Sequence, residues 1–203
     1  MKLPFFFRTN EQVLTPNIQL VLLTLRSEKL PGESLHFKSG MSAYFRNQRP
    51  LSVGSVKLRS KNPADDLLIE HNYFNYQSEI REFIDAVSIA RKVLSQPALA
   101  EYIGDELYPG PSVSSDKELE NFIRASAKTG IHWTGTCRMG DPDAAPTPEA
   151  ARQLVVDTEM RVCGLRGLRV VDASVMPSVP SGNIMAPIIM VAERAADFIK
   201  SQY

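Results

Sequence analysis

The chain has 203 residues, and its 23 lysine and arginine residues balance 23 aspartate and glutamate residues. This length allows one large or two small domains with a sizeable core, and the even charge does not indicate nucleic acid or an anionic membrane as partner. No apolar run approaches the roughly 18 residues that a membrane-spanning helix needs. We therefore expect a soluble chain, with the cytoplasm favoured as its location.

The two cysteines give no indication of a metal site. Cys137 and Cys163 form no Cys-x-x-Cys pair and have no histidine cluster near them, so zinc is not expected. A reduced compartment is the default for such a chain, although a single disulfide stays open. We expect Cys137 to be a small buried thiol rather than a reactive one.

The first third of the sequence predicts short strands separated by loops. Branched and alternating apolar residues indicate strands, and a Pro-Gly pair indicates a loop. Four short strands in succession are typical of an antiparallel sheet. The predicted segments are a buried strand at 17–25, a loop at 28–34, one or two strands at 35–46, a strand at 54–60 and a short apolar run at 67–69.

Helical spacing follows. Apolar residues recur at helical intervals from Glu79 to about Leu94, and Pro97 breaks or restarts that helix. Ser115 and Glu118 match a capping box, which predicts a second helix ending near Ala127. Two Pro-rich loops are also predicted, at 105–114 and 140–150.

The C-terminal part predicts a strand, a turn and a helix. The strand covers 165–172 and ends in the carboxylate of Asp172, and Ser181 or Asn183 can cap a helix that reaches about Lys200. The first half of this helix is apolar nearly all round, so we expect its start to be buried. Such a layout is common for a ligand at the carboxyl end of a sheet, where the helix N-terminus offers N–H groups to an anionic group.

Two segments carry unusual residue combinations. Thr129–Met139, Thr-Gly-Ile-His-Trp-Thr-Gly-Thr-Cys-Arg-Met, places His132 in a stretch too polar for a core, and Val171–Pro187 contains the patterns Asp-Ala-Ser and Ser-Gly-Asn. Together they resemble the C-terminal signatures of the glucose–methanol–choline (GMC) family of flavin-dependent alcohol oxidoreductases.

The resemblance implies an FAD cofactor and specific roles for a few residues. It implies that His132 accepts the alcohol proton while hydride leaves for the flavin, and that Asn183 orients the alcohol oxygen and stabilises it as it gains charge. It also implies that Asp172, Ala173, Asn183 and Ile184 line the flavin. Without the resemblance, His132 is a core or capping histidine, Asn183 a helix cap and Asp172 a plain strand-end carboxylate.

Three other aromatic or histidine residues receive no catalytic role from the sequence. His36 and His71 match no motif and are expected to be surface or structural residues. Trp133 follows His132 directly, and because adjacent side chains usually point apart, we expect it to pack on the substrate domain rather than on the flavin.

The predicted fold is of the α+β and α/β classes. An antiparallel sheet with helices forms part of a substrate-binding domain over residues 1–125, and residues 126–203 contribute the C-terminal strand and helix of a flavin-binding α/β domain. Family members open with a Gly-x-Gly-x-x-Gly unit for the dinucleotide, a spacing that this sequence does not contain. We therefore expect a fragment or a chain that works with an N-terminal FAD-binding half, and an exposed apolar last helix in the lone chain.

The function predicted from the sequence is that of the C-terminal catalytic portion of an FAD-dependent alcohol oxidase or dehydrogenase. Two alternatives stay open: a hydroxynitrile lyase of the same fold, which keeps the flavin without a redox step, and a non-catalytic binding module derived from the family. The motifs suit choline, sugars, aliphatic and aromatic alcohols alike, so they leave the substrate and the electron acceptor open.

Overall fold

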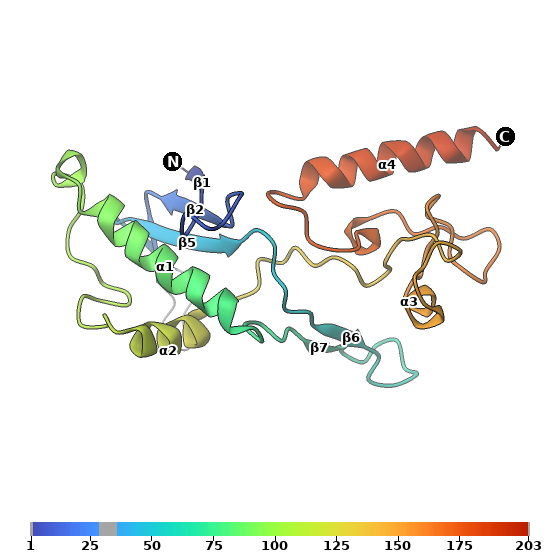
Figure 1. Cartoon of the computed structure of the whole chain (residues 1–203), viewed down its shortest axis with the longest axis horizontal. Helices are drawn as coiled ribbons and strands as arrows, with labels where there is room; N and C mark the ends of the chain where they lie inside the picture. Colours follow the sequence, from blue (N-terminus) through green and yellow to red (C-terminus); the bar gives the residue numbers. More distant parts are fainter. Residues whose placement is uncertain (1, 29–35, 203) are drawn as a thin grey trace. The chain divides into compact units, whose positions relative to one another are not determined.

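The structure, a computed structural model, describes residues 2–28 and 36–202, and these residues form two compact units (Figure 1). The first unit comprises the chain up to Ser52 together with Tyr73–Ala127, and the second comprises Val53–Asn72 and the chain from Lys128 onward. The chain therefore leaves the first unit after Ser52, contributes a short segment to the second, and returns at Tyr73.

The first unit contains a three-stranded antiparallel sheet in the order β1-β2-β5. The strands are β1 (Lys2–Phe7), β2 (Ile18–Leu23) and β5 (Ser42–Asn47). The central strand β2 is buried along almost its whole length, as its continuous apolar run predicts. A separate antiparallel pair joins β3 (Arg26–Glu28) to β4 (His36–Lys38).

Two helices belong to the first unit, and one of them packs on this sheet. Helix α1 (Gln77–Leu94) lies across β2 and β5 and also contacts α2 (Asp116–Ser126), and the 3₁₀ turn η1 (Pro97–Leu99) follows α1 (Figure 1). The apolar stripes of the two helices meet in one buried cluster. Its members are Ile80, Ile84, Val87, Leu119 and Ile123.

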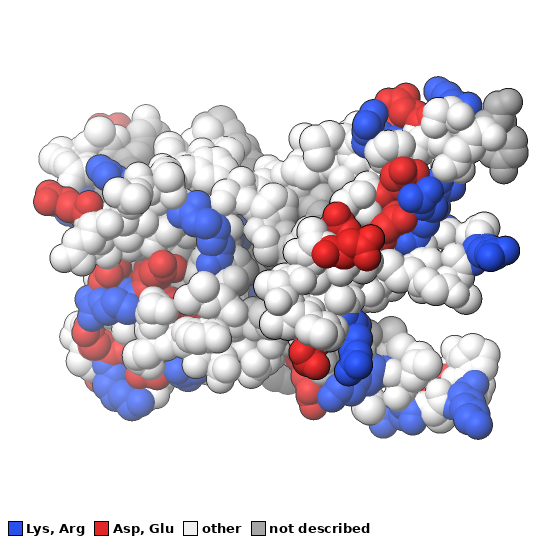
Figure 2. Space-filling view, turned by 45° about the vertical axis from the view of Figure 1, so that its right-hand side comes forward, with Lys and Arg blue, Asp and Glu red and all other residues white. Residues whose placement is uncertain are grey.

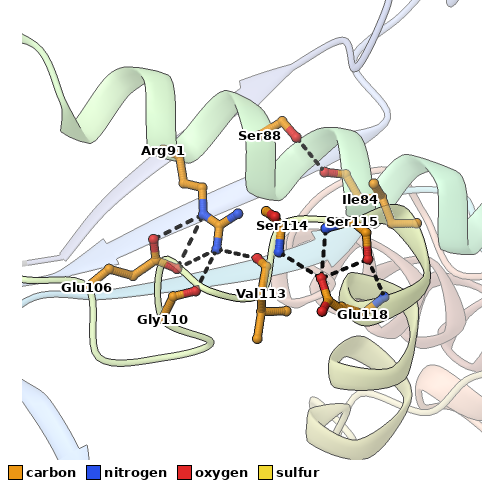
Figure 3. Close-up of polar contacts among 9 residues, drawn as sticks. All are labelled: Ile84, Ser88, Arg91, Glu106, Gly110, Val113, Ser114, Ser115 and Glu118. Carbon is orange, nitrogen blue, oxygen red and sulfur yellow. Dashed lines mark hydrogen bonds and ion pairs between the residues drawn. The ribbon is translucent and has the colours of Figure 1, made fainter.

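Arg91 fixes the loop between the two helices (Figure 3). Its guanidinium binds the Glu106 carboxylate, with 2.8 Å between Nη2 and Oε1, and donates to the carbonyl oxygens of Gly110 and Val113 at 3.1 and 2.9 Å. A charged group that satisfies two backbone carbonyls as well as a carboxylate holds a loop more firmly than a single ion pair would. The Pro-rich segment predicted as a loop is thus ordered by one side chain.

Helix α2 begins with the predicted capping box (Figure 3). The Ser115 hydroxyl accepts a hydrogen bond from the Glu118 N–H at 3.3 Å, and the Glu118 carboxylate accepts one from the Ser115 N–H at 3.0 Å. Hydrogen bonds from the Ser115 side chain and from the backbone of Ser115 and Ser114 lower the pKa of Glu118. The backbone N–H groups of Ser115 and Glu118, which would otherwise have no partner at the helix start, therefore each find an acceptor.

The second unit is built mainly from loops and short elements. It contains the antiparallel hairpin of β6 (Ser55–Lys57) and β7 (Leu68–Glu70), the short helix α3 (Pro148–Arg152), the 3₁₀ turn η2 (Ala173–Val175) and the long helix α4 (Met185–Lys200). Its buried apolar side chains are Val156, Met160, Val175, Met176, Ile184 and Ala195. Within the described part of the chain, no helix is both long and apolar enough to cross a membrane.

The predicted fold class is confirmed, because antiparallel sheets and helices make up the structure. The strands predicted in 17–25, 35–46, 54–60 and 67–69 all form, as do the first two helices. They build three small sheets rather than one, and strand β1 was not predicted. The loop predicted at 28–34 lies outside the described residues, apart from Glu28 at the end of β3.

Three further predictions have mixed outcomes. The Pro-rich segment 140–150 is not only a loop, because Thr147 caps α3 and Pro148 occupies its first turn. Cys137 is only partly buried and Cys163 is exposed, and the two thiols are not joined. The division after residue 125 into substrate and flavin portions stays a prediction, and it did not anticipate that Val53–Asn72 belongs with the C-terminal unit.

The surface carries charges of both signs. Figure 2 shows lysine and arginine side chains lying beside aspartate and glutamate side chains across the face that it draws, with uncharged areas between them. This mixture agrees with the zero net charge of the chain.

We expect Ser115→Ala to lower the free energy of unfolding by about 1 kcal/mol, because the hydroxyl acceptor of the capping box is lost. Ser114→Ala is the matched control, since Ser114 contributes its backbone N–H to Glu118 and keeps it after the substitution. Denaturant unfolding of the two variants measures the difference. Equal stabilities would show that the cap contributes nothing.

Candidate active site

The first signature segment contains a strained residue immediately before His132. Ile131 has φ 59°, in the left-handed region that a β-branched residue rarely enters, at a cost of order 1–3 kcal/mol. Its N–H donates to the Thr129 hydroxyl at 3.0 Å. Residues in such conformations persist only where neighbouring contacts hold them, so the backbone that carries His132 is specified by its surroundings.

The side chain of His132 is exposed and lies beside Gly130. A Cβ at Gly130 would be 3.9 Å from His132 Cδ2, which is ordinary contact distance. Among the described residues, the His132 ring makes no hydrogen bond or ion pair within the chain. Both of its nitrogen atoms are thus available to a bound molecule.

Trp133 packs within the second unit. Its indole, 49% exposed, stacks on the His71 ring with 5.9 Å between ring centroids. The partner comes from the hairpin segment that precedes α1 in the sequence. His71 is therefore a structural residue beside the signature segment, and no pattern around it in the sequence indicated this contact.

The strand predicted at 165–172 does not form. Gly164 and Gly167 both have left-handed φ values, 79° and 74°, and they turn the chain back on itself so that only an isolated bridge joins Arg161 to Arg169. Asp172 therefore does not end a strand. Its carboxylate accepts the Ser174 N–H at 2.8 Å and caps η2.

The two signature segments are joined by their backbones. The Cys137 N–H donates to the Ser174 carbonyl at 3.0 Å, and the Met139 N–H donates to the Val175 carbonyl at 2.9 Å. Gly135 has φ 84°, and a Cβ there would come within 3.4 Å of the Met176 carbonyl oxygen. The two segments are far apart in the sequence, and the fold places their backbones side by side.

The first signature segment also pairs with a third stretch of backbone that contains Val155. The Val155 N–H donates to the Arg138 carbonyl at 2.9 Å, and the following turn is closed by Asp157 and Arg161, whose charged groups are 2.8 Å apart. Partial burial raises the pKa of Asp157, but hydrogen bonds from the Arg161 side chain and from backbone N–H groups outweigh it and leave the pKa below its usual value.

Helix α4 begins without a side-chain cap. Ile184 occupies the cap position in a helical conformation, and its side chain makes no capping hydrogen bond. The prediction that Ser181 or Asn183 caps this helix is wrong, because the helix starts after Ile184 and Asn183 lies outside it. Pro187 has no N–H, so Met185 and Ala186 provide the N–H groups of the first turn.

The apolar face of α4 is mostly exposed. Ile184 is buried, but Met185, Ile189 and Met190 are 66%, 53% and 64% exposed. The prediction of a buried helix start is wrong for this structure, because the unit covers α4 mainly on the side of Ala195, which is 2% exposed. The exposed helix agrees with the expectation for the lone chain.

The candidate residues belong to the two signature segments that these backbone hydrogen bonds join. Neither His132 nor Asn183 makes a side-chain hydrogen bond in the described part of the chain, and Ala173 and Ile184 lie on η2 and before α4. Ser174 adds a residue that the sequence did not single out. Its hydroxyl is buried and has no hydrogen-bond partner among the described residues, so the site contains a polar atom that a ligand could satisfy.

Comparison with known families identifies the chain. The family model described as GMC oxidoreductase matches residues 50–192. The chain belongs to the GMC oxidoreductase family. Both signature segments lie within the matched residues.

Curated relatives of this GMC oxidoreductase chain include choline dehydrogenases. An oxygen-dependent choline dehydrogenase from Burkholderia lata is 44% identical over 97% of the chain and 33% of its own length. The mitochondrial choline dehydrogenase of Homo sapiens is 41% identical over 97% of the chain and 32% of its own length. The chain spans about a third of the length of these relatives.

Solved structures of the family share the fold of this GMC oxidoreductase chain. A pyridoxine 4-oxidase from Mesorbium loti superposes with a TM-score of 0.80 at 28% identity, covering 98% of this chain and 37% of the other. An FAD-dependent oxidoreductase from Chaetomium thermophilum superposes with a TM-score of 0.73 at 26% identity, covering 93% of this chain and 28% of the other.

We expect Gly135→Ala to lower the free energy of unfolding by roughly 1–3 kcal/mol, because alanine is strained at φ 84°. Gly130→Ala is the matched control in the same segment, since Gly130 does not have a positive φ and its Cβ would make only an ordinary contact. Thermal or denaturant unfolding tests this. Equal stability of the two variants would contradict the role of Gly135 at the junction of the segments.

Proposed function

We propose that this chain is the C-terminal catalytic portion of an FAD-dependent alcohol oxidoreductase. The observation that carries the proposal is the backbone pairing of the two signature segments, with the side chains of His132 and Asn183 left without partners in the described chain. A histidine and an amide whose side chains make no hydrogen bond within the described chain are suited to a reacting hydroxyl group.

The residues around η2 and α4 fit a flavin. Helix α4 begins at Met185 after a cap residue, Ile184, whose side chain makes no capping hydrogen bond, and a helix N-terminus favours a group that gains negative charge. The buried hydroxyl of Ser174 needs a partner. FAD supplies a ring that accepts hydride, and we propose that Asp172, Ala173, Asn183 and Ile184 line it.

The proposed chemistry divides between two side chains. A neutral imidazole nitrogen of His132 accepts the proton of the alcohol hydroxyl. The amide N–H of Asn183 donates a hydrogen bond to the same oxygen and stabilises the charge that develops on it. Together they orient the alcohol so that its carbon faces the hydride acceptor.

The proposed substrate class is a small alcohol. Choline is the first compound to test, because the curated relatives named above are choline dehydrogenases. Pyridoxine is the second, because the solved structure with a TM-score of 0.80 is a pyridoxine 4-oxidase. Whether oxygen or another carrier takes the electrons is a separate measurement on the reduced enzyme.

We also propose that the activity requires an N-terminal FAD-binding half. The relatives are about three times as long as the chain, and the sequence contains no Gly-x-Gly-x-x-Gly segment for the dinucleotide. In this proposal residues 1–125 belong to the substrate-binding domain and residues 126–203 complete the flavin domain.

His132→Ala should slow reduction of the bound flavin by about 10²- to 10⁴-fold, the usual range for loss of a general base. The wild-type rate should rise with pH through one ionisation, because only the neutral imidazole can accept a proton. Stopped-flow bleaching of the flavin with an alcohol, in the flavin-loaded enzyme, measures both effects.

The matched control for this experiment is His36→Ala, since His36 lies in β4 of the first unit. Bleaching at the wild-type rate in the His132 variant would remove the base assignment. Tight flavin binding without bleaching by any alcohol would favour the hydroxynitrile lyase, and failure of any N-terminal half to restore flavin binding would favour the non-catalytic module.

Asn183→Ala should lower the rate of flavin reduction by roughly 10²-fold, by analogy with other donors to a charge-developing oxygen. Because Asn183 caps no helix in this structure, its removal should leave the thermal unfolding midpoint unchanged. Ser178→Ala, an exposed residue in the same loop, is the control. A variant that is destabilised but reduces flavin normally would assign Asn183 a purely structural role.

A further inference from the structure

The aromatic stack beside His132 joins two distant parts of the second unit. The planes of the His71 and Trp133 rings are 17° apart and their centroids are 5.9 Å apart, within the range of attractive offset stacking. His71 follows strand β7, whereas Trp133 directly follows the proposed base. The stack therefore ties the hairpin to the first signature segment.

The hairpin end that carries His71 is held firmly. Asn72 has a left-handed φ of 53°, and its amide donates to the Val53 carbonyl at 2.9 Å. Gly54 lies so close to the opposite strand that a Cβ there would be 2.9 Å from the His71 carbonyl oxygen. The backbone of His71 is thus fixed from two sides, and its ring presents a stationary surface to Trp133.

The first signature segment, which carries Trp133, depends on the fixed His71 ring because it contains a strained residue. Ile131 is strained at φ 59°, and a β-branched residue leaves that conformation unless its neighbours oppose the change. The Thr129 hydroxyl holds it on the N-terminal side. On the C-terminal side the described ring contact is that of Trp133 with His71, and His132 lies between the two restraints.

We propose that His71 and Trp133 form an aromatic clamp that fixes the direction of His132. His71 is then a positioning residue, and its ring contact matters rather than its ability to take a proton. The inference rests on the proposed function, because it takes His132 as the base. A displacement of about 1 Å in a catalytic group can cost on the order of 10² in rate, so loss of the clamp has a measurable effect.

The stack itself can be tested without flavin, because Trp133 is the single tryptophan of the chain. A protonated imidazole in contact with an indole quenches its fluorescence, so the emission of the chain should rise with pH. His71→Phe should abolish this step, and His36→Phe and His132→Phe should keep it. A step that survives in His71→Phe would overturn the clamp.

The effect on the reaction needs the flavin-loaded enzyme and an alcohol. His71→Ala should lower the limiting rate of flavin reduction by roughly 10-fold or more, with the flavin content, the thermal unfolding midpoint and the dissociation constant of the alcohol unchanged. His71→Phe, which keeps a ring in contact with Trp133, should restore the rate to within about 3-fold of wild type. If His71→Phe is as slow as His71→Ala, the imidazole acts chemically and the clamp is overturned.

Ile131→Gly provides an independent test. Glycine adopts the left-handed conformation without strain but also leaves it freely, so the rate should fall while the unfolding midpoint does not. If the rate of flavin reduction falls only together with the unfolding midpoint, in this variant or in His71→Ala, the ring contact serves stability alone and the clamp is overturned.

The clamp and the proposed function fail in different ways. If His71→Ala reduces flavin at the wild-type rate while His132→Ala is slow, the clamp is wrong and the base assignment stands. If His132→Ala is also as fast as wild type, the base assignment is wrong. The proposal that the clamp positions this base is then wrong as well.

Discussion

Two backbone hydrogen bonds hold the candidate site together. The bonds from Cys137 to Ser174 and from Met139 to Val175 join segments that the sequence separates. Because both bonds use only backbone groups, the side chains on either segment remain available for other contacts. Both carbonyls belong to η2, whose first residues Asp172 caps, so the junction connects the first signature segment directly to this turn.

Much of the fold could be predicted from local rules. The capping box of Ser115 and Glu118 and the helical spacing in α1 depend on neighbours within one or two turns, so the sequence carries the information directly. Strand β1 was missed because Phe5, Phe6 and Phe7 do not alternate with polar residues, and only pairing with β2 makes them a strand. The separation into three small sheets also depends on long-range pairing that periodicity cannot report.

For the site as well, the sequence pointed to candidate residues but not to their arrangement in space. The signature segments singled out His132 and Asn183, and their roles stay predictions. The strand expected before Asp172 does not form, because Gly164 and Gly167 turn the chain with left-handed φ values despite the apolar residues that follow them. The contact of His71 with Trp133 could not be predicted, because no local pattern links residues so far apart in the sequence.

Two unfavourable features coincide at the start of α4. Met185 and Ile189 expose apolar surface, and the cap residue Ile184 offers no side-chain hydrogen bond to the first-turn N–H groups. Each has a cost in an isolated protein, since apolar surface in water and unsatisfied helix donors are both unfavourable. A neighbour with an apolar body and an edge that gains negative charge would relieve both at once. A flavin ring has this composition, and an adjoining protein domain could cover the rest of the exposed face, which supports placing the proposed hydride acceptor at this end of the helix.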